Sequence, residues 1–217
     1  EMKMVIIFRI YILILLMTEG QLSGADLQFI IDYPRQDKEG VVEGRVLLLL
    51  SQNDEKEPRF QISDNSTTGF VFGLDAIGKQ APEGVTIDNN IFGYPVSSLD
   101  DIPAGEYWVQ GLIHQYETFD LKTGHRVKLP MDRGEGQRWH SAPGNYYSTP
   151  KKINLDPKKR KTIKITLDQE IPAIEPPKDT EYIKHIRIQS KLLSEFWGRP
   201  MHLGAHVLLP QGYDEHP

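Results

Sequence analysis

Short apolar segments separated by polar turns recur along the chain, and this pattern predicts β-strands rather than helices. In residues 106–114 the apolar side chains fall on one face with a period of two, at Tyr107, Val109 and Ile113. Other runs rich in aliphatic or β-branched residues occupy positions 27–33, 41–51 and 70–74. No stretch up to residue 170 keeps a helical period. We therefore expect a mainly β fold, with a β-sandwich over residues 26–170.

The segments 152–155 and 162–167 are predicted to form a β-hairpin around a basic turn. Across such a hairpin the first segment, with Ile153 and Leu155, would face a second apolar set, namely Ile163, Ile165 and Leu167. The basic residues around the turn fit a solvent-facing edge that stays soluble. The alternative is a surface for nucleic acid or an anionic membrane, which the formal net charge of −5 disfavours.

A second, smaller unit is expected after a proline-rich linker at residues 171–181, because proline stiffens the chain and removes backbone donors. Residues 182–217 contain two predicted strands with a helical turn between them. This unit has too little apolar area to fold alone, and several of its side chains would lack packing partners, namely Leu192, Leu193, Phe196 and Trp197. We therefore expect a domain that begins at residue 182 and is cut off at residue 217.

The apolar run Val207, Leu208 and Leu209 is typical of a strand that is covered on both faces. If the neighbouring strand lies beyond residue 217, backbone groups and apolar side chains of this strand should be exposed. Such an edge pairs readily with another chain. We expect residues 26–217 to self-associate, and a chain that ends near Gln169 to be monomeric.

The N-terminus has the order of a secretory signal peptide. Lys3 and Arg9 flank an apolar run at residues 10–17, and the small residues Ser23, Gly24 and Ala25 follow. A membrane anchor is the alternative, but the apolar run is shorter than the roughly 20 residues that span a bilayer. The sequence thus predicts a leader at residues 1–25, cleavage near Ala25 and a secreted or periplasmic protein without a stable membrane span.

The chain contains no cysteine, which limits its chemistry. Disulfides, cysteine-based zinc sites and a thiol nucleophile are excluded. No spacing of Asp132, Glu135 and His140 matches a metal-binding motif, so we expect neither a metal nor a cofactor. His206 alternates within a predicted strand and is interpreted as a structural histidine.

The last thirty or so residues contain a Gly-Arg pair, Gly198 and Arg199, and the segment Leu209, Pro210, Gln211, Gly212, Tyr213 and Asp214. Through these residues the segment resembles the opening of a family of enterochelin-esterase-like and esterase-D-like α/β-hydrolases. The resemblance implies a strand, a turn and a second strand that open a catalytic domain. The family's Gly-x-Ser-x-Gly nucleophile elbow and its histidine follow much later in the chain, and this sequence has no such elbow. No catalytic residue is therefore assigned, and the chain alone is expected to be inactive on esters.

Residues 99–107 are similar to the turn and strand of many extracellular sandwich modules, including the Ig-like or E-set sandwiches that often precede such hydrolases. The resemblance implies that the chain is the non-catalytic N-terminal β-sandwich of an exported esterase-like serine hydrolase. Its partner would be the hydrolase domain beyond residue 217, and a carboxylic ester would be the substrate of the parent protein.

The long loop at residues 130–150 is the candidate contact surface, because long irregular loops in compact domains are often functional. Its candidate residues are Trp139, His140, Asn145, Tyr146 and Tyr147. Aromatic rings beside amides suit a carbohydrate or a small ester, but the same residues would also suit contact with the hydrolase domain. Trp139 is expected to be dispensable for folding because it lies on a loop. A self-contained carbohydrate-binding module that uses this loop is the alternative function.

Overall fold

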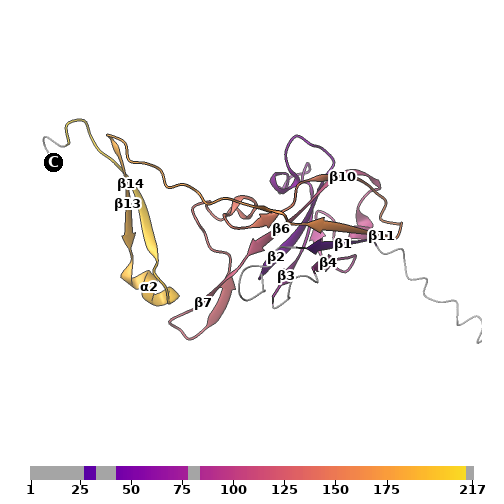
Figure 1. The fold of residues 1–217 in the computed structure, drawn as a ribbon, viewed down its shortest axis with the longest axis horizontal. Helices are drawn as coiled ribbons and strands as arrows, with labels where there is room; N and C mark the ends of the chain where they lie inside the picture. Colours follow the sequence, from indigo (N-terminus) through magenta and orange to yellow (C-terminus); the bar gives the residue numbers. More distant parts are fainter. Residues whose placement is uncertain (1–26, 33–42, 78–83, 214–217) are drawn as a thin grey trace, which may run out of the picture.

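The computed structural model describes residues 27–32, 43–77 and 84–213, and the predicted leader at residues 1–25 lies outside them. Strands dominate this part of the chain, so the expectation of a mainly β fold is confirmed (Figure 1). The first half contributes β1 (Leu27–Asp32), β2 (Gly44–Ser51), β3 (Phe70–Ala76), β4 (Val85–Ile87), β5 (Gly93–Tyr94) and β6 (Gly105–Gln115). The single-turn helices η1 (Pro58–Phe60) and η2 (Leu99–Asp101) lie in the connections between these strands.

The larger sheet is built around β2 and β6, and all of β2 pairs antiparallel with residues 108–115 of β6. Its strand order is β12-β9-β6-β2-β3-β5, and β10 also pairs with β6. The outer strands are β9 (Tyr146–Tyr147), β10 (Lys151–Leu155) and β12 (Gln169–Glu170). The run of buried aliphatic residues in β2 reflects coverage on both faces.

A smaller sheet packs against one face of the larger one. It consists of β11 (Lys161–Thr166), β1 and β4, with β1 parallel to β11 and antiparallel to β4. One core of fully buried side chains joins the two sheets, with members such as Phe29, Ile31, Leu48, Phe72 and Tyr107. Residues 27–170 thus form two β-layers around a shared core.

Gly111 shows how closely the two layers approach in the middle of β6. A Cβ atom at this position would lie 2.8 Å from Leu167 Cδ2 and 3.1 Å from Ile165 Cγ2. A glycine is therefore required by packing rather than by the backbone angles.

The predicted hairpin of residues 152–155 and 162–167 is wrong in its pairing. β10 pairs with β6 in the larger sheet, whereas β11 pairs with β1 in the smaller sheet. The apolar residues of both segments nevertheless meet, because Leu155, Ile165 and Leu167 lie in the core between the sheets. The basic turn between them therefore crosses from one layer to the other.

A β-arm projects from the sandwich after β6. It consists of β7 (Glu117–Asp120) and β8 (Arg126–Leu129), which pair only with each other among the described residues. In Figure 1 the arm reaches from the sandwich toward the C-terminal part of the chain.

The predicted linker begins one residue later than expected. Ile171 is 8% exposed, and its N–H donates to Asn145 O at 2.9 Å, so this residue belongs to the sandwich. Residues 172–180 form neither helix nor strand. They lead to a C-terminal hairpin of β13 (Ile183–Gln189) and β14 (His202–Leu208), with α2 (Lys191–Trp197) between the two strands.

Local signals in the sequence fix the ends of α2. The Ser190 side chain caps its N-terminus by accepting from the N–H of Leu193 at 3.3 Å. Gly198 ends the helix in the left-handed conformation, with φ of 67°. The C-terminal unit is therefore a strand, a helical turn and a strand, as the sequence predicts.

Candidate functional site

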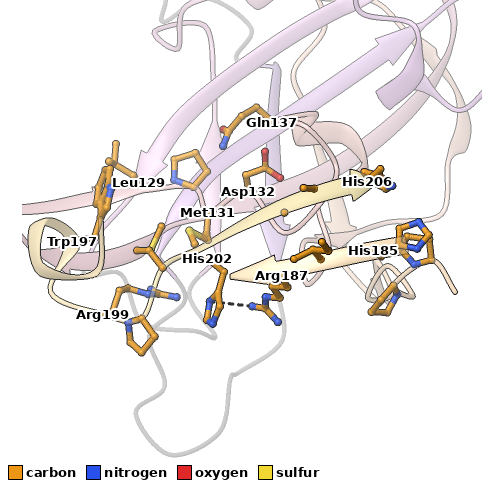
Figure 2. Close-up of a pocket in the computed structure, with 18 of the residues that line it drawn as sticks. Leu129, Met131, Asp132, Gln137, His185, Arg187, Trp197, Arg199, His202 and His206 are labelled. Carbon is orange, nitrogen blue, oxygen red and sulfur yellow. Dashed lines mark hydrogen bonds between the residues drawn. The ribbon is translucent and has the colours of Figure 1, made fainter. Parts of the chain in front are cut away.

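A cavity of about 1100 Å³ lies between the C-terminal hairpin and the part of the sandwich that faces it (Figure 2). One wall comes from β13 and β14 and from the turn after α2. The other wall comes from the β7–β8 arm and from the first part of the loop at residues 130–150. We take this cavity as the candidate site because charged, polar and apolar side chains from both parts of the chain converge on it.

The strand register separates the C-terminal hairpin into two chemically different faces. Directly opposed residues of an antiparallel pair share a face. The pairs His185–His206, Arg187–Gly204 and Gln189–His202 therefore form one side, which we call the basic face. The pairs Ile186–Ala205, Ile188–Leu203 and Lys184–Val207 form the other side, which we call the apolar face.

The basic face lines the cavity with His185, Arg187, His202 and His206. The rings of His185 and His206 meet edge to face, with their centroids 4.6 Å apart. Arg187 Nη2 lies 3.3 Å from His202 Nδ1, as the dashed line in Figure 2 marks. His206 is exposed, and its ring packs against that of His185, so its interpretation as a structural histidine stays a prediction.

Asp179 ties the linker to this face. Its carboxylate accepts from the backbone N–H of His185 at 2.8 Å and lies 3.2 Å from the ring of the same residue. The backbone and ring contacts of His185 hold the pKa of the Asp179 carboxyl below its usual range. The carboxylate is therefore ionised near neutral pH and compensates part of the positive charge.

The opposite wall is largely apolar. Its side chains include Phe119, Leu129, Pro130 and Met131. Asp132 and Gln137 add polar groups to this wall, and the Asp132 carboxylate accepts from the N–H groups of Gly134 and Gly136 at 2.8 and 3.3 Å. The cavity thus offers donors on one wall and apolar contact on the other.

Glu117, on the arm, binds one arginine of its own wall and one of the opposite wall. Its Oε1 accepts from Arg133 Nη2 at 2.7 Å, and its Oε2 accepts from Arg199 Nη1 at 2.6 Å. Burial acts to raise the pKa of the Glu117 carboxyl, but the hydrogen bonds and charges of the two guanidinium groups outweigh it and lower the pKa. We call these three residues the Glu117 clamp.

Ring and backbone contacts reinforce the clamp at the end of α2. The rings of Phe119 and Trp197 meet edge to face at 5.2 Å, and the Arg199 guanidinium lies over the Phe119 ring at 4.9 Å. The N–H of Lys122 donates to Phe196 O at 2.9 Å. Trp197 therefore has a packing partner, contrary to the expectation from the sequence.

Gly198 lets the end of α2 lie close to the β7–β8 arm, because a Cβ atom at this position would collide with the carbonyl oxygen of Asp120. Its left-handed backbone conformation also disfavours any other residue. The pair Gly198 and Arg199, which carries part of the esterase resemblance, thus forms the contact with the β7–β8 arm.

The five candidate residues of the 130–150 loop do not gather into one site. Tyr146 packs on the core between the sheets, whereas Tyr147 lies on the opposite face of the larger sheet. Asn145 is 2% exposed; its Nδ2 donates to Trp139 O at 2.9 Å and its Oδ1 accepts from the N–H of Gln115 at 3.0 Å. Its amide therefore satisfies the loop backbone and is not free for a ligand.

The other two candidates, Trp139 and His140, join a cluster on the outer face of the larger sheet. They lie in the short helix η3 (Trp139–Ser141), and Trp139 packs with Tyr147 on the buried residues Leu47, Leu49 and Leu112. Trp139 is therefore half-buried and contributes to packing, while its expected dispensability for folding stays a prediction.

Arg59 fills the space between the aromatic rings of this cluster. Its guanidinium lies 4.0 Å from the centroid of the Tyr147 ring and 4.5 Å from that of Phe60, and it donates to His140 O at 3.1 Å. Burial lowers the pKa of His140, and the charges of Arg59 and Arg138 lower it further. The Tyr147 face next to Arg59 is thus occupied from within the protein, which disfavours its use as a stacking platform for sugar.

The sequence did not single out Glu117, Phe119 or Arg133, which connect the arm to the loop and to the C-terminal hairpin. No motif marks them, since an acidic residue and an aromatic one on a short strand are common. The only residue of the Glu117 clamp that the sequence analysis named is Arg199, which carries part of the esterase resemblance. Among the described residues, no group of three or more histidine or acidic side chains lies close enough to hold a metal.

The chain was compared with models of protein families, with curated proteins and with solved structures, and none of them matches. In the part of the chain that the structure describes, no helix is both long and apolar enough to cross a membrane.

Proposed function

We propose that residues 27–171 are the non-catalytic β-domain of an exported esterase-like serine hydrolase. Residues 182–213 are then the first elements of its catalytic α/β-hydrolase domain. The β-domain holds this start of the catalytic domain through the Glu117 clamp.

The observation that carries the proposal is the apolar face of the C-terminal hairpin. Ile186 is 42% exposed, Ile188 is 61% exposed and Leu203 is 55% exposed. Ile186 and its partner Ala205 border the cavity, whereas Ile188 and Leu203 lie outside its lining and are covered by no part of the sandwich that borders the cavity. A contiguous exposed apolar surface of this kind usually marks an interface, and further elements of a hydrolase sheet are its natural cover.

The local geometry of the matching residues supports the same conclusion. The resemblance implies a strand, a Gly-Arg turn and a second strand. Gly198 and Arg199 lie between α2 and β14, and both contact the arm. A turn that docks on the preceding domain would set the orientation of the catalytic domain from its first residues.

The proposal is tested by the coding sequence that follows residue 217. We expect it to continue with a Gly-x-Ser-x-Gly segment and, later, an acidic residue and a histidine in the order of α/β-hydrolases. The full protein should hydrolyse p-nitrophenyl acetate, and replacement of the elbow serine by alanine should abolish this activity. A stop codon directly after Pro217 would contradict the proposal.

A further inference from the structure

The cavity between the basic face and the arm has the size and the mixed lining of a small-molecule site. Its volume is about 1100 Å³, while ligand pockets typically enclose roughly 300–1000 Å³. It is formed by residues of this chain alone, so an inference about it does not rest on the proposed function.

The charged groups of the cavity leave one cation without an acidic partner. Arg199 is neutralised by Glu117, and His185 contacts Asp179. Arg187 forms no ion pair with any described residue, and its guanidinium contacts the ring of His202. Asp132 lies on the opposite wall, and Figure 2 shows it well separated from the Arg187–His202 pair.

The contact between Arg187 and His202 determines which ring nitrogen of His202 carries the proton and can donate to a ligand. A guanidinium group can only donate, so Nδ1 of His202 must accept, and the ring proton then lies on Nε2. Both side chains therefore offer N–H donors to an anion in the cavity. A single unpaired arginine beside a neutral histidine suits one negative charge better than the double charge of a phosphate.

An apolar surface is available for the rest of such a ligand. Leu129 belongs to the arm, and Trp197 lies at the end of α2 and is half-buried. Phe119 also borders the cavity but is 3% exposed, because the Trp197 ring and the Arg199 guanidinium pack on its ring. Leu129 is 41% exposed, so part of its side chain is open to contact.

We propose that this cavity binds a small organic carboxylate with an aromatic or branched aliphatic body. The carboxylate accepts hydrogen bonds from Arg187 and His202, and the apolar body lies against Leu129 and Trp197. Asp132 on the facing wall disfavours a second negative charge on the ligand.

Equilibrium dialysis of the full chain tests this site, with 2-naphthoate as the probe and 2-naphthalenemethanol as its neutral counterpart. We expect saturable binding of the naphthoate and binding of the alcohol that is weaker by about 3-fold to 10-fold, the usual range for a partly exposed charged hydrogen bond. Absence of saturable naphthoate binding, or equal binding of both probes, would overturn the proposal.

Three variants assign the binding to named side chains. Arg187→Gln should weaken naphthoate binding by about 3-fold to 10-fold and leave the alcohol unaffected. Asp132→Asn keeps the acceptor for Gly134 and Gly136 and should strengthen naphthoate binding by about 2-fold. Arg160→Gln removes an exposed arginine of the turn before β11, outside the cavity lining, and serves as the control. If Arg187→Gln and Arg160→Gln bind naphthoate equally well, the site is not the one described.

Discussion

Loss of the negative charge of Glu117 should loosen the C-terminal hairpin from the β7–β8 arm. Glu117→Gln keeps the size of the side chain but replaces the ion-paired hydrogen bond from Arg199, 2.6 Å long, by one from the charged guanidinium to a neutral amide oxygen. Hydrogen bonds to charged groups contribute about 1.5–3 kcal/mol, and exposed ion pairs contribute about 0–1 kcal/mol. Glu117 is 26% exposed and Arg199 is 37% exposed, so an intermediate value of about 1 kcal/mol applies. The population of the undocked state should therefore rise about 5-fold.

Hydrogen exchange at the N–H of Lys122 measures this population directly. This amide donates to Phe196 O across the contact and is released when the hairpin undocks. The N–H of Leu121 donates to His125 O within the arm and provides the internal control. We expect Glu117→Gln to accelerate exchange at Lys122 about 5-fold and to leave Leu121 unchanged.

A matched variant separates the clamp from a general loss of charge on the arm. Asp120→Asn removes an exposed carboxylate whose partner is Arg126, on the arm itself. It should leave exchange at Lys122 unchanged. Equal acceleration at Lys122 and Leu121 in Glu117→Gln would show that Glu117 stabilises the arm itself, and the clamp would then be refuted.

The pKa of Glu117 gives the same contact a dependence on pH. The docked state lowers this pKa below its ordinary value of 4.5, so the contribution of the carboxylate to docking is fully present above about pH 4.5. It is lost as the pH falls through the lower pKa of the docked state. Exchange at Lys122, corrected for the intrinsic exchange rate, should lose its protection in acid, and this loss should be smaller in Glu117→Gln.

Three further predictions concern the sandwich and the apolar face. Trp139→Ala should reduce the free energy of unfolding in urea by about 1–2 kcal/mol without unfolding the protein, because the ring is half-buried on Leu47 and Leu49. An unchanged urea midpoint would contradict the packing role of Trp139. Gly111→Ala should reduce the free energy of unfolding by about 1–3 kcal/mol. Gly105→Ala on the same strand should be tolerated, since the nearest atom to its new Cβ would be 3.8 Å away. The chain should self-associate in light scattering. The double replacement Ile188→Lys with Leu203→Lys should reduce this association, whereas Gln189→Lys on the basic face should not. Equal association of the unchanged chain and both variants would exclude the apolar face as the surface of self-association.

Residue patterns within single segments predicted the strands well. The alternation in residues 106–114 became β6, and the apolar run after residue 44 became β2, covered on both faces. A serine before α2 and a glycine after it marked the ends of that helix. These features depend on neighbours in the sequence, so the sequence contains the signal for them.

Features that depend on distant partners were missed or misread. Ile153 and Ile163 fit a local hairpin, but which strand each one joins is decided by β6 and β1. Asn145 was interpreted as a ligand-binding amide, and only the path of the loop shows that its side chain satisfies Trp139 O and the N–H of Gln115. Periodicity gives no information on such long-range pairing, and for the same reason Glu117 carried no signal.

Labelling with a fluorophosphonate, which reacts with activated serines, tests the central claim most directly. It compares the protein isolated from its natural source with residues 1–217 alone. We predict that the natural protein is labelled on a single serine outside residues 1–217, and that the label and the hydrolysis of p-nitrophenyl acetate are lost together when this serine is replaced by alanine. Residues 1–217 alone should take no label and should not hydrolyse the ester. A natural protein that takes no label, or a labelled serine within residues 1–217, would contradict the assignment of this chain as the non-catalytic part of a serine hydrolase.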